Sequence, residues 1–211
     1  MKKLDQLTKW AVELQSIAQN GLEYGHDRFD RERYEQIRVI ATKIMAAKTD
    51  LPLKVVKGLF SSEDGYQTPK VSTRAAIFQD QKIMLVKEST DNLWSMPGGW
   101  CEPNLTVKEN CIKETKEEAG HQITVERIIA VNNHSTNIHN KEQVERVINV
   151  CNVIFLCHDL GGKFAQNTET KECKYFSLTN LPDLSLPRNT LEEVKMCFAA
   201  NNDPQWQTKF E

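Results

Sequence analysis

The chain has little that would place it in a membrane or on a polyanion. No apolar run approaches the ~18 residues that a spanning helix needs. The opening residues 1–15 are broken by charged Asp5, Lys9 and Glu13, where a signal peptide would be apolar. The 27 Lys and Arg are balanced by 29 Asp and Glu, which leaves a formal net charge of −2. The sequence therefore predicts a cytoplasmic protein that contacts neither membrane nor nucleic acid.

Cysteine motifs for metal or redox chemistry are also missing. The six cysteines include no C-x-x-C pair, which excludes a zinc ribbon and a thioredoxin-like motif. Cysteines in a cytoplasmic chain of this length are typically buried thiols. We therefore expect no disulfide.

The 211-residue chain is longer than one domain of about 100–150 residues and shorter than two. Residues 1–64 are expected to form a small helical domain, with a second helix capped by Asp30 and a third starting at Pro52. Residues 65–70 are a predicted linker, and residues 71–211 form the second domain. The apolar face of the first helix is predicted to consist of Leu4, Leu7, Ala11, Leu14 and Ala18.

The helical domain is too small to bury much surface alone, so we expect it to pack on the rest of the chain or on a second copy. It carries eleven basic and ten acidic residues over 1–64. That balance gives no basic recognition face, which disfavours a helix-turn-helix reader of DNA. A role in forming a homodimer fits better.

From residue 71 onward apolar residues recur at every second position, which indicates strands. Asp80-Gln81 and Gly161-Gly162 are predicted turns. The expected elements are strands over 71–77 and 82–87, a helix over 106–119, strands over 122–132, 146–157 and 172–177, and a helix over 190–200. A mixed sheet covered by helices is an α+β fold.

The helix over 106–119 has clear boundary signals and concentrates acidic residues. Thr106 begins a capping-box pattern, and Gly120 stands where a glycine cap belongs. Glu114, Glu117 and Glu118 fall in one wedge of ~100°. Acids in the C-terminal half of a helix oppose its dipole at a cost of up to ~1 kcal/mol each. A cation site would offset that cost, and a solvated acidic face is the alternative.

Hard carboxylate ligands suit Mg²⁺, with Mn²⁺ as a second candidate. Protein-bound Mg²⁺ commonly also contacts substrate phosphates, which indicates phosphoryl chemistry with an activated water. Gly98-Gly99 precede the helix and would let the backbone approach the metal or the phosphates closely.

Residues 99–121 resemble the Nudix box, in which glycine, glutamate, Arg-Glu and Glu-Glu-x-Gly recur at fixed spacing. The matching residues are Gly99, Glu114, Glu117, Glu118 and Gly120, and the departures are Leu105, Lys113, Thr115 and His121. Leu105 and Lys113 replace a Glu and an Arg that chiefly hold the loop against the helix in this family. The metal-binding glutamates are retained, so the resemblance implies a metal-dependent hydrolase.

The N-terminal run WAVELQSIAQNGLEYGHDRFDRERYE and the junction GYQTPKVSTRAAIF are similar to the helical domain that precedes one Nudix subfamily. Those enzymes form homodimers and hydrolyse nucleoside diphosphates linked to another group, notably CDP-choline and ADP-ribose. The resemblance implies an α/β/α Nudix fold, a nucleotide-type substrate, and release of a nucleoside monophosphate and a phosphorylated partner.

By position, the resemblance implies Glu114 and Glu118 as direct metal ligands, Glu117 as a ligand or outer carboxylate, and the Gly98 carbonyl as a further ligand. Glu118 and Glu117 thus belong to the catalytic set. The general base stays open: Glu169 follows the central strands, where several family members carry it. The competing residues are Glu142, Glu145 and Glu117.

Several residues are candidates to contact the substrate. Arg74 and Arg146 are candidates to reach phosphates, and Gly99 lies in the loop that meets them. Candidates to stack on a base are Trp94, Tyr66 and Phe176. His134 and His139 lie in a polar run that either is solvated or forms a lid.

Two other functions remain open from the sequence. Leu105 and Lys113 replace the Glu and the Arg of the family pattern, and that change is compatible with a sensor that binds a nucleotide without hydrolysing it. A hydrolase that removes damaged nucleoside triphosphates is the third alternative, which the helical domain disfavours.

Overall fold

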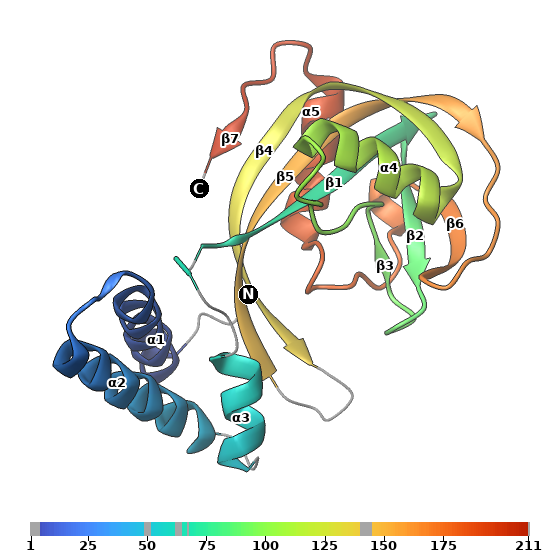
Figure 1. The fold of residues 1–211 in the computed structure, drawn as a ribbon. Helices are drawn as coiled ribbons and strands as arrows, with labels where there is room; N and C mark the ends of the chain where they lie inside the picture. The colour runs from blue at the N-terminus through green and yellow to red at the C-terminus, as the bar shows by residue number, and fades with distance from the viewer. Residues whose placement is uncertain (1–4, 49–51, 62–64, 67, 140–144, 211) are drawn as a thin grey trace. The chain divides into compact units, whose positions relative to one another are not determined.

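The computed structural model describes residues 5–48, 52–61, 65–66, 68–139 and 145–210, with side chains except at 59–60 and 134–148 (Figure 1). Two compact units emerge: Met1–Pro69 with Ser135–Asn149, and Lys70–His134 with Val150–Glu211. Residues 135–149 belong to the predicted domain 71–211 in sequence and group with the helical residues here; the predicted domain bounds stay a prediction.

The first unit contains three helices, α1 (Gln6–Tyr24), α2 (Arg28–Ala46) and α3 (Leu53–Phe60). The Asp5 carboxylate caps α1, and the Asp27 carboxylate caps α2 by accepting from the backbone N–H groups of Phe29 and Asp30. The predicted cap at Asp30 is therefore wrong by one turn. Asp30 lies in the first turn of the helix, where its negative charge interacts favourably with the positive end of the helix dipole.

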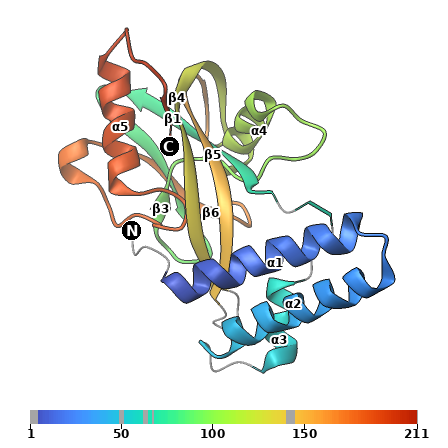
Figure 2. The ribbon, with the colours of Figure 1, turned by 90° about the vertical axis from the view of Figure 1, so that its left-hand side faces the viewer.

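A glycine lets α1 and α2 approach closely, as Figure 2 shows for the pair. A Cβ at Gly21 would lie 2.4 Å from the ring of Tyr34 on α2. Ala11, Met45 and Val56 form the small core of this unit. The expected face of α1 is confirmed only in part, because Ala11 and Ala18 are buried whereas Leu7 is half exposed.

The second unit is built on a seven-stranded mixed sheet in the order β3-β2-β1-β5-β4-β7, with β6 paired to β2. The strands are β1 (Lys70–Gln79), β2 (Lys82–Glu88), β3 (Trp94–Ser95), β4 (His121–His139), β5 (Glu145–Gly162), β6 (Thr170–Phe176) and β7 (Lys209–Phe210). β1 is central, parallel to β5 and antiparallel to β2. Asp80 and Gln81 form the predicted turn, with φ of 48° and 57°, as a two-residue hairpin requires.

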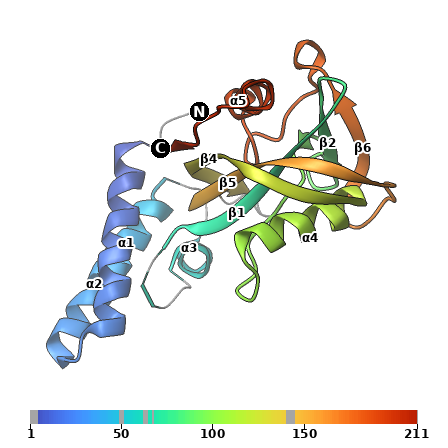
Figure 3. The same cartoon turned by 90° about the horizontal axis from the view of Figure 1, so that it is seen from above.

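Two helices cover opposite faces of the sheet, α4 (Val107–Ala119) and α5 (Leu191–Asn202). Figure 3 shows the sheet between them. Cys111 and Ala119 of α4 pack in one core cluster, and Val194 and Phe198 of α5 pack in the other. The predicted α+β fold with an α/β/α arrangement is confirmed.

Boundary signals predicted α4 well and β5 poorly. Thr106 and Glu109 form the expected capping box, and Gly120 ends the helix in the left-handed region at φ 73°. The predicted turn at Gly161-Gly162 is wrong, because both residues extend β5. A Cβ at Gly162 would lie 2.3 Å from the carbonyl oxygen of Gly120, so this glycine permits a close backbone approach instead.

All six cysteines are free thiols, as expected. Cys111, Cys157 and Cys197 are buried and the other three are partly buried. Among the described residues, no helix combines the length and apolar character that crossing a bilayer requires.

Candidate active site

A short loop, residues 96–99, runs beside β1 and leads toward α4; it is called the Gly98 loop below. The N–H of Ala75 donates to the carbonyl of Pro97 at 2.8 Å, and the N–H of Thr73 donates to that of Gly99 at 3.0 Å. These bonds hold the loop along the central strand of the sheet.

Glycine is required at position 98 for two reasons. Its φ is 143°, which side chains rarely allow, and a Cβ there would lie 2.0 Å from the carbonyl oxygen of Thr73. The bare backbone lets the Gly98 N–H donate to Oε2 of Glu118 at 2.8 Å. A Cβ at Gly99 would lie 2.6 Å from Oε2 of Glu114. The Gly98 loop therefore fits against two carboxylates of α4.

Three carboxylates converge beside this loop. Glu114 and Glu118 extend from α4, and Glu169 comes from the turn before β6; one oxygen of each lies within 4.8 Å of the others. Glu118 is 5% exposed, whereas Glu169 is open to solvent. Such a group of hard oxygen ligands, partly open to solvent, suits a divalent cation that also contacts substrate.

Side chains of the turn itself bring Glu169 to α4. Oδ1 of the Asn167 side chain accepts from the backbone N–H groups of Glu169 and Thr170 at 2.9 and 2.8 Å. Its amide donates to the carbonyl of Glu117 at 2.9 Å, and the Thr170 hydroxyl donates to the carbonyl of Glu118 at 2.7 Å. The turn is thus tied to the unpaired carbonyls at the end of the helix. The Asn-x-x-Thr spacing is the sequence signal for this turn, which was not among the predicted elements.

Burial makes the carboxyl groups of Glu114 and Glu118 weaker acids. The pKa of Glu118 is raised to about 8, mainly by burial, against the opposing effects of Arg74 and the Gly98 N–H. Burial also raises the pKa of Glu114, with Lys113 opposing. A metal ion would compensate the cost of burying these charges.

Glu117 lies outside the cluster of three. It is exposed, and its Oε2 is 2.6 Å from the ammonium of Lys113. Its predicted roles as ligand and catalytic group stay predictions. Lys113 also contacts Glu102 at 3.2 Å and Glu114 at 3.4 Å. Glu102 lies in the segment between the Gly98 loop and α4. Its ion pair with Lys113 joins this segment to the helix, which Leu105 cannot do.

Asn110 of α4 also binds the segment that contains Glu102. Its side chain is fully buried, accepting from the Glu102 N–H at 3.1 Å and donating to the hydroxyl of Thr73 at 3.2 Å. Nothing in its local sequence marked it, because an asparagine inside a helix gives no pattern.

Arg74 lies under the Gly98 loop, and its predicted contact with a phosphate stays a prediction. Its side chain is buried at 8% exposure, and its Nη1 donates to the carbonyls of Met96 (3.2 Å) and Gly98. Burial lowers its pKa, with Glu118 opposing. Arg74 thus shapes the Gly98 loop, and the Gly98 carbonyl has a donor of its own; its role as a metal ligand stays a prediction.

Two of the aromatic candidates, Trp94 and Phe176, pack on each other. Trp94 is in the core at 8% exposure, edge-on to Phe176 with 4.8 Å between ring centroids, so the structure does not support stacking on a base. Tyr66 is exposed and belongs to the other compact unit. The remaining candidates, Glu142 and the side chains of His134, His139, Glu145 and Arg146, lie outside the described residues.

Comparison with protein families divides the chain in two. Residues 5–60 match the model described as UDP-X-like, N-terminal oligomerisation domain. Residues 68–196 match the NUDIX domain.

Individual relatives extend this similarity. A Bacillus subtilis (strain 168) protein with the provisional name ADP-ribose pyrophosphatase YjhB is 35% identical over 97% of this chain and 98% of its own. A crystal structure titled UDP-X diphosphatase is 30% identical, with a TM-score of 0.60 over 96% of this chain and 97% of that chain. An ADP-ribose pyrophosphatase from Streptococcus suis 89-1591 is 42% identical, with a TM-score of 0.59 over 68% of this chain and all of that chain (100%).

Proposed function

The chain belongs to the Nudix hydrolase family, and we propose that it cleaves ADP-ribose-type substrates with a divalent cation held by Glu114, Glu118 and Glu169. At the coarser level, it is a pyrophosphatase that hydrolyses the diphosphate of nucleoside diphosphates linked to a second group. The observation that carries the proposal is the convergence of the three carboxylates within 4.8 Å beside the Gly98 loop.

The donor set fits Mg²⁺, with Mn²⁺ as the alternative. All three ligand groups are carboxylates, and cysteine or histidine is absent from this group of described residues. Oxygen-only ligands select hard cations over zinc or copper. When bound, such a cation neutralises phosphate oxygens and lowers the pKa of a coordinated water.

The residues of the chain would position the substrate-binding loop and accept a proton. Arg74 and Glu118 hold the Gly98 loop, whose glycines let it pack directly against the central strand and the carboxylate of Glu114. In the reaction, the oxygen of a water molecule bonds to phosphorus and the bridging P–O bond breaks. Glu169 is exposed and adjacent to the other acids, so its second carboxylate oxygen, which would not contact the cation, is our candidate to accept the water's proton. The products are a nucleoside monophosphate and the phosphorylated second group.

Full-length similarity to proteins named for ADP-ribose and UDP-X supports a nucleoside diphosphate substrate over a triphosphate. CDP-choline remains a candidate on the Nudix subfamily resemblance alone. The helical domain adds to this support, because its matching model is itself described as UDP-X-like.

A substrate panel tests the proposal. Purified full-length protein would be incubated with ADP-ribose, CDP-choline, a UDP-sugar or a nucleoside triphosphate, in Mg²⁺, Mn²⁺ or EDTA. We expect AMP from ADP-ribose with either metal and none in EDTA, measured by ion-exchange chromatography. Pyrophosphate released from the triphosphate alone would favour a sanitising hydrolase. Tight binding of a nucleotide without any product in either metal would favour a sensor.

A homodimer is proposed from an apolar stripe on α1. Its members share one wedge of ~100° on the helix surface, and each is about half exposed: Leu7, Trp10, Ile17 and Tyr24. Isolated exposed apolar residues are ordinary, but a stripe along one helix marks an interaction surface. The oligomerisation domain matched over residues 5–60 supports a second copy of this chain as the partner.

Trp10→Glu should convert the dimer to a monomer, because a charge would enter the centre of the stripe. Light scattering after gel filtration should then give one chain mass, 24.2 kDa, in place of twice that value. Lys9→Glu is the matched control, since Lys9 is exposed on the same helix but outside the wedge. A dimer that persists in Trp10→Glu would contradict the assigned surface.

A further inference from the structure

A segment far along the chain borders the strand that leads into the Gly98 loop. This segment, residues 183–190, precedes α5 and is called the approach segment. The Trp94 N–H donates to the carbonyl of Asp183 at 3.0 Å, and the Ser185 N–H donates to the carbonyl of Trp94 at 2.8 Å. Two residues later, the Met96 N–H donates to Oδ1 of Asn189 at 2.8 Å.

Asn189 is fully buried, and only one end of its amide is used. Its Nδ2 is without a hydrogen-bond partner in the described part of the chain. Burying an unpaired amide donor costs free energy, which an apolar side chain of similar size would avoid. The Oδ1 contact to Met96 is therefore what an asparagine specifically supplies at this position.

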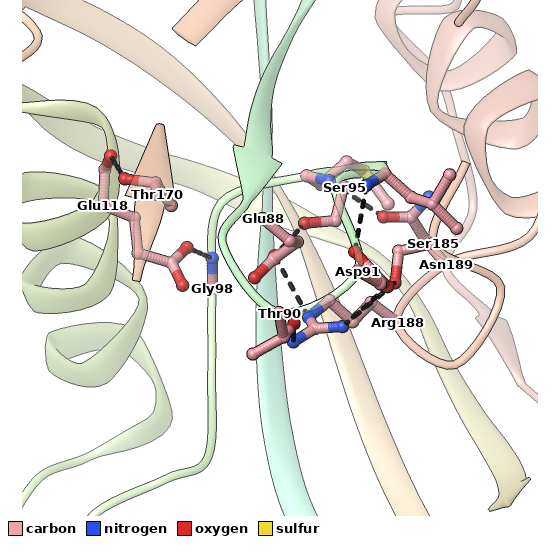
Figure 4. A network of polar contacts seen from close by, with 12 residues as sticks. Glu88, Thr90, Asp91, Ser95, Gly98, Glu118, Thr170, Ser185, Arg188 and Asn189 are labelled. Atoms are coloured by element: carbon pink, nitrogen blue, oxygen red, sulfur yellow. Dashed lines mark hydrogen bonds and ion pairs between the residues drawn. The ribbon is translucent and has the colours of Figure 1, made fainter. Parts of the chain in front are cut away.

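An ion-pair network fixes the residue beside Asn189, as Figure 4 shows. Nε of Arg188 lies 3.0 Å from Oε1 of buried Glu88, and its Nη atoms contact Asp91 (3.4 Å) and the Thr90 hydroxyl (3.1 Å). Glu88 in turn accepts from the hydroxyl of Ser95. With a further contact from Nη1 to the Ser185 hydroxyl at 3.0 Å, four polar contacts restrict the planar guanidinium strongly. The approach segment is thus anchored on the turn between β2 and β3.

Only two peptide units separate this anchor from the carboxylate cluster. Asn189 holds the Met96 N–H, and Arg74 holds the carbonyls of Met96 and Gly98. The Gly98 N–H then donates to Glu118. Pro97 lies between these two N–H groups and its ring fixes its φ, so a rotation of the rigid peptide plane at Met96 has few dihedral angles to absorb it before the Gly98 N–H.

We propose that Asn189 is a positioning residue that orients the Gly98 loop against Glu118 and so sets the affinity of the site for a divalent cation. The inference rests on the proposed role of Glu118 in holding the cation. Asn189 touches neither cation nor substrate and acts through the backbone of residues 96–98.

Asn189→Leu tests the inference, because leucine keeps the volume and removes the acceptor. Mn²⁺ titrated by calorimetry into the full-length protein, without substrate, should bind about tenfold more weakly than to wild type, as is typical when a residue that orients a metal ligand is lost. With ADP-ribose at saturating Mn²⁺, KM should stay within about twofold. Asn132→Leu is the matched control: Asn132 is also buried in this unit, but it donates to Glu193 at 3.2 Å and not to the loop.

Equal Mn²⁺ affinity in Asn189→Leu and wild type would overturn the inference, as would an equal loss in Asn132→Leu. If Asn189→Leu does not fold by circular dichroism, the smaller Asn189→Ser, whose hydroxyl is too short for the same bond, takes its place with the same expectation. The proposed function can fail separately. Wild type that binds Mn²⁺ but leaves ADP-ribose intact would refute the substrate while the affinity comparison still stands.

Discussion

Glu118→Gln should reduce the turnover of ADP-ribose about a thousandfold, because a metal ligand contributes several kcal/mol to transition-state stabilisation and each ~1.4 kcal/mol is a factor of ten. Glutamine keeps the shape and an oxygen that can accept from the Gly98 N–H. The loop should therefore stay in place while the negative charge is lost. Removing a buried charge also relieves a desolvation cost, so we expect no loss of thermal stability.

Initial rates at several Mg²⁺ concentrations, with melting temperatures alongside, measure this effect. Glu192→Gln, an exposed residue on α5, is the matched control and should turn over like wild type. Glu117→Gln should show a smaller loss than Glu118→Gln, since Glu117 pairs with Lys113 on the exposed side of α4. Undiminished hydrolysis by Glu118→Gln would refute the proposed site.

Gly98→Ala should both destabilise the protein and abolish hydrolysis. The added Cβ would lie 2.0 Å from the Thr73 carbonyl oxygen and 2.9 Å from Cα of Arg74, both on the central strand, at a φ of 143° that alanine rarely adopts. Backbone shifts of this kind cost ~1–3 kcal/mol or more. At ~2–4 °C per kcal/mol, the melting temperature should fall by roughly 5–10 °C.

Scanning calorimetry and the chromatographic assay together test Gly98→Ala. Gly58→Ala provides the comparison, because Gly58 lies within α3 and an added Cβ there meets nothing within 4 Å. Alanine in a helix should raise stability slightly, by up to ~1 kcal/mol. A Gly98→Ala protein with wild-type melting and turnover would show that the loop adapts, contrary to the close approach described above.

Local sequence signals predicted α4 and the placing of two of its acids on one side. The capping box at Thr106 and the glycine cap at Gly120 fix the ends of α4, and helical spacing brings Glu114 and Glu118 onto one side. These features depend on neighbours a few residues away, so the sequence contains them directly. Glu169 was a candidate from family position, and the structure brings it to the same cluster.

The direction of Arg74 could not be predicted in this way. Alternation distinguishes the two faces of a strand only when one face meets water, and residues 72–77 of β1 are buried throughout. The burial of Trp94 could not be predicted for a related reason, since a two-residue strand is too short to show an alternation of apolar and polar residues. The pairing of Met96 with Asn189, 93 residues apart, is set by tertiary packing alone.

That separation bears on when the site can first exist during synthesis. At roughly 5–20 residues per second, Asn189 leaves the ribosome some 5–20 s after Met96, given the 93 residues between them. Glu169 also follows α4 along the chain. A nascent chain that ends after α4 displays its glutamates without the turn and the approach segment that complete their surroundings. The complete cluster of Glu114, Glu118 and Glu169 therefore forms late in synthesis, so a cation that needs all three carboxylates could not act as an early template for folding.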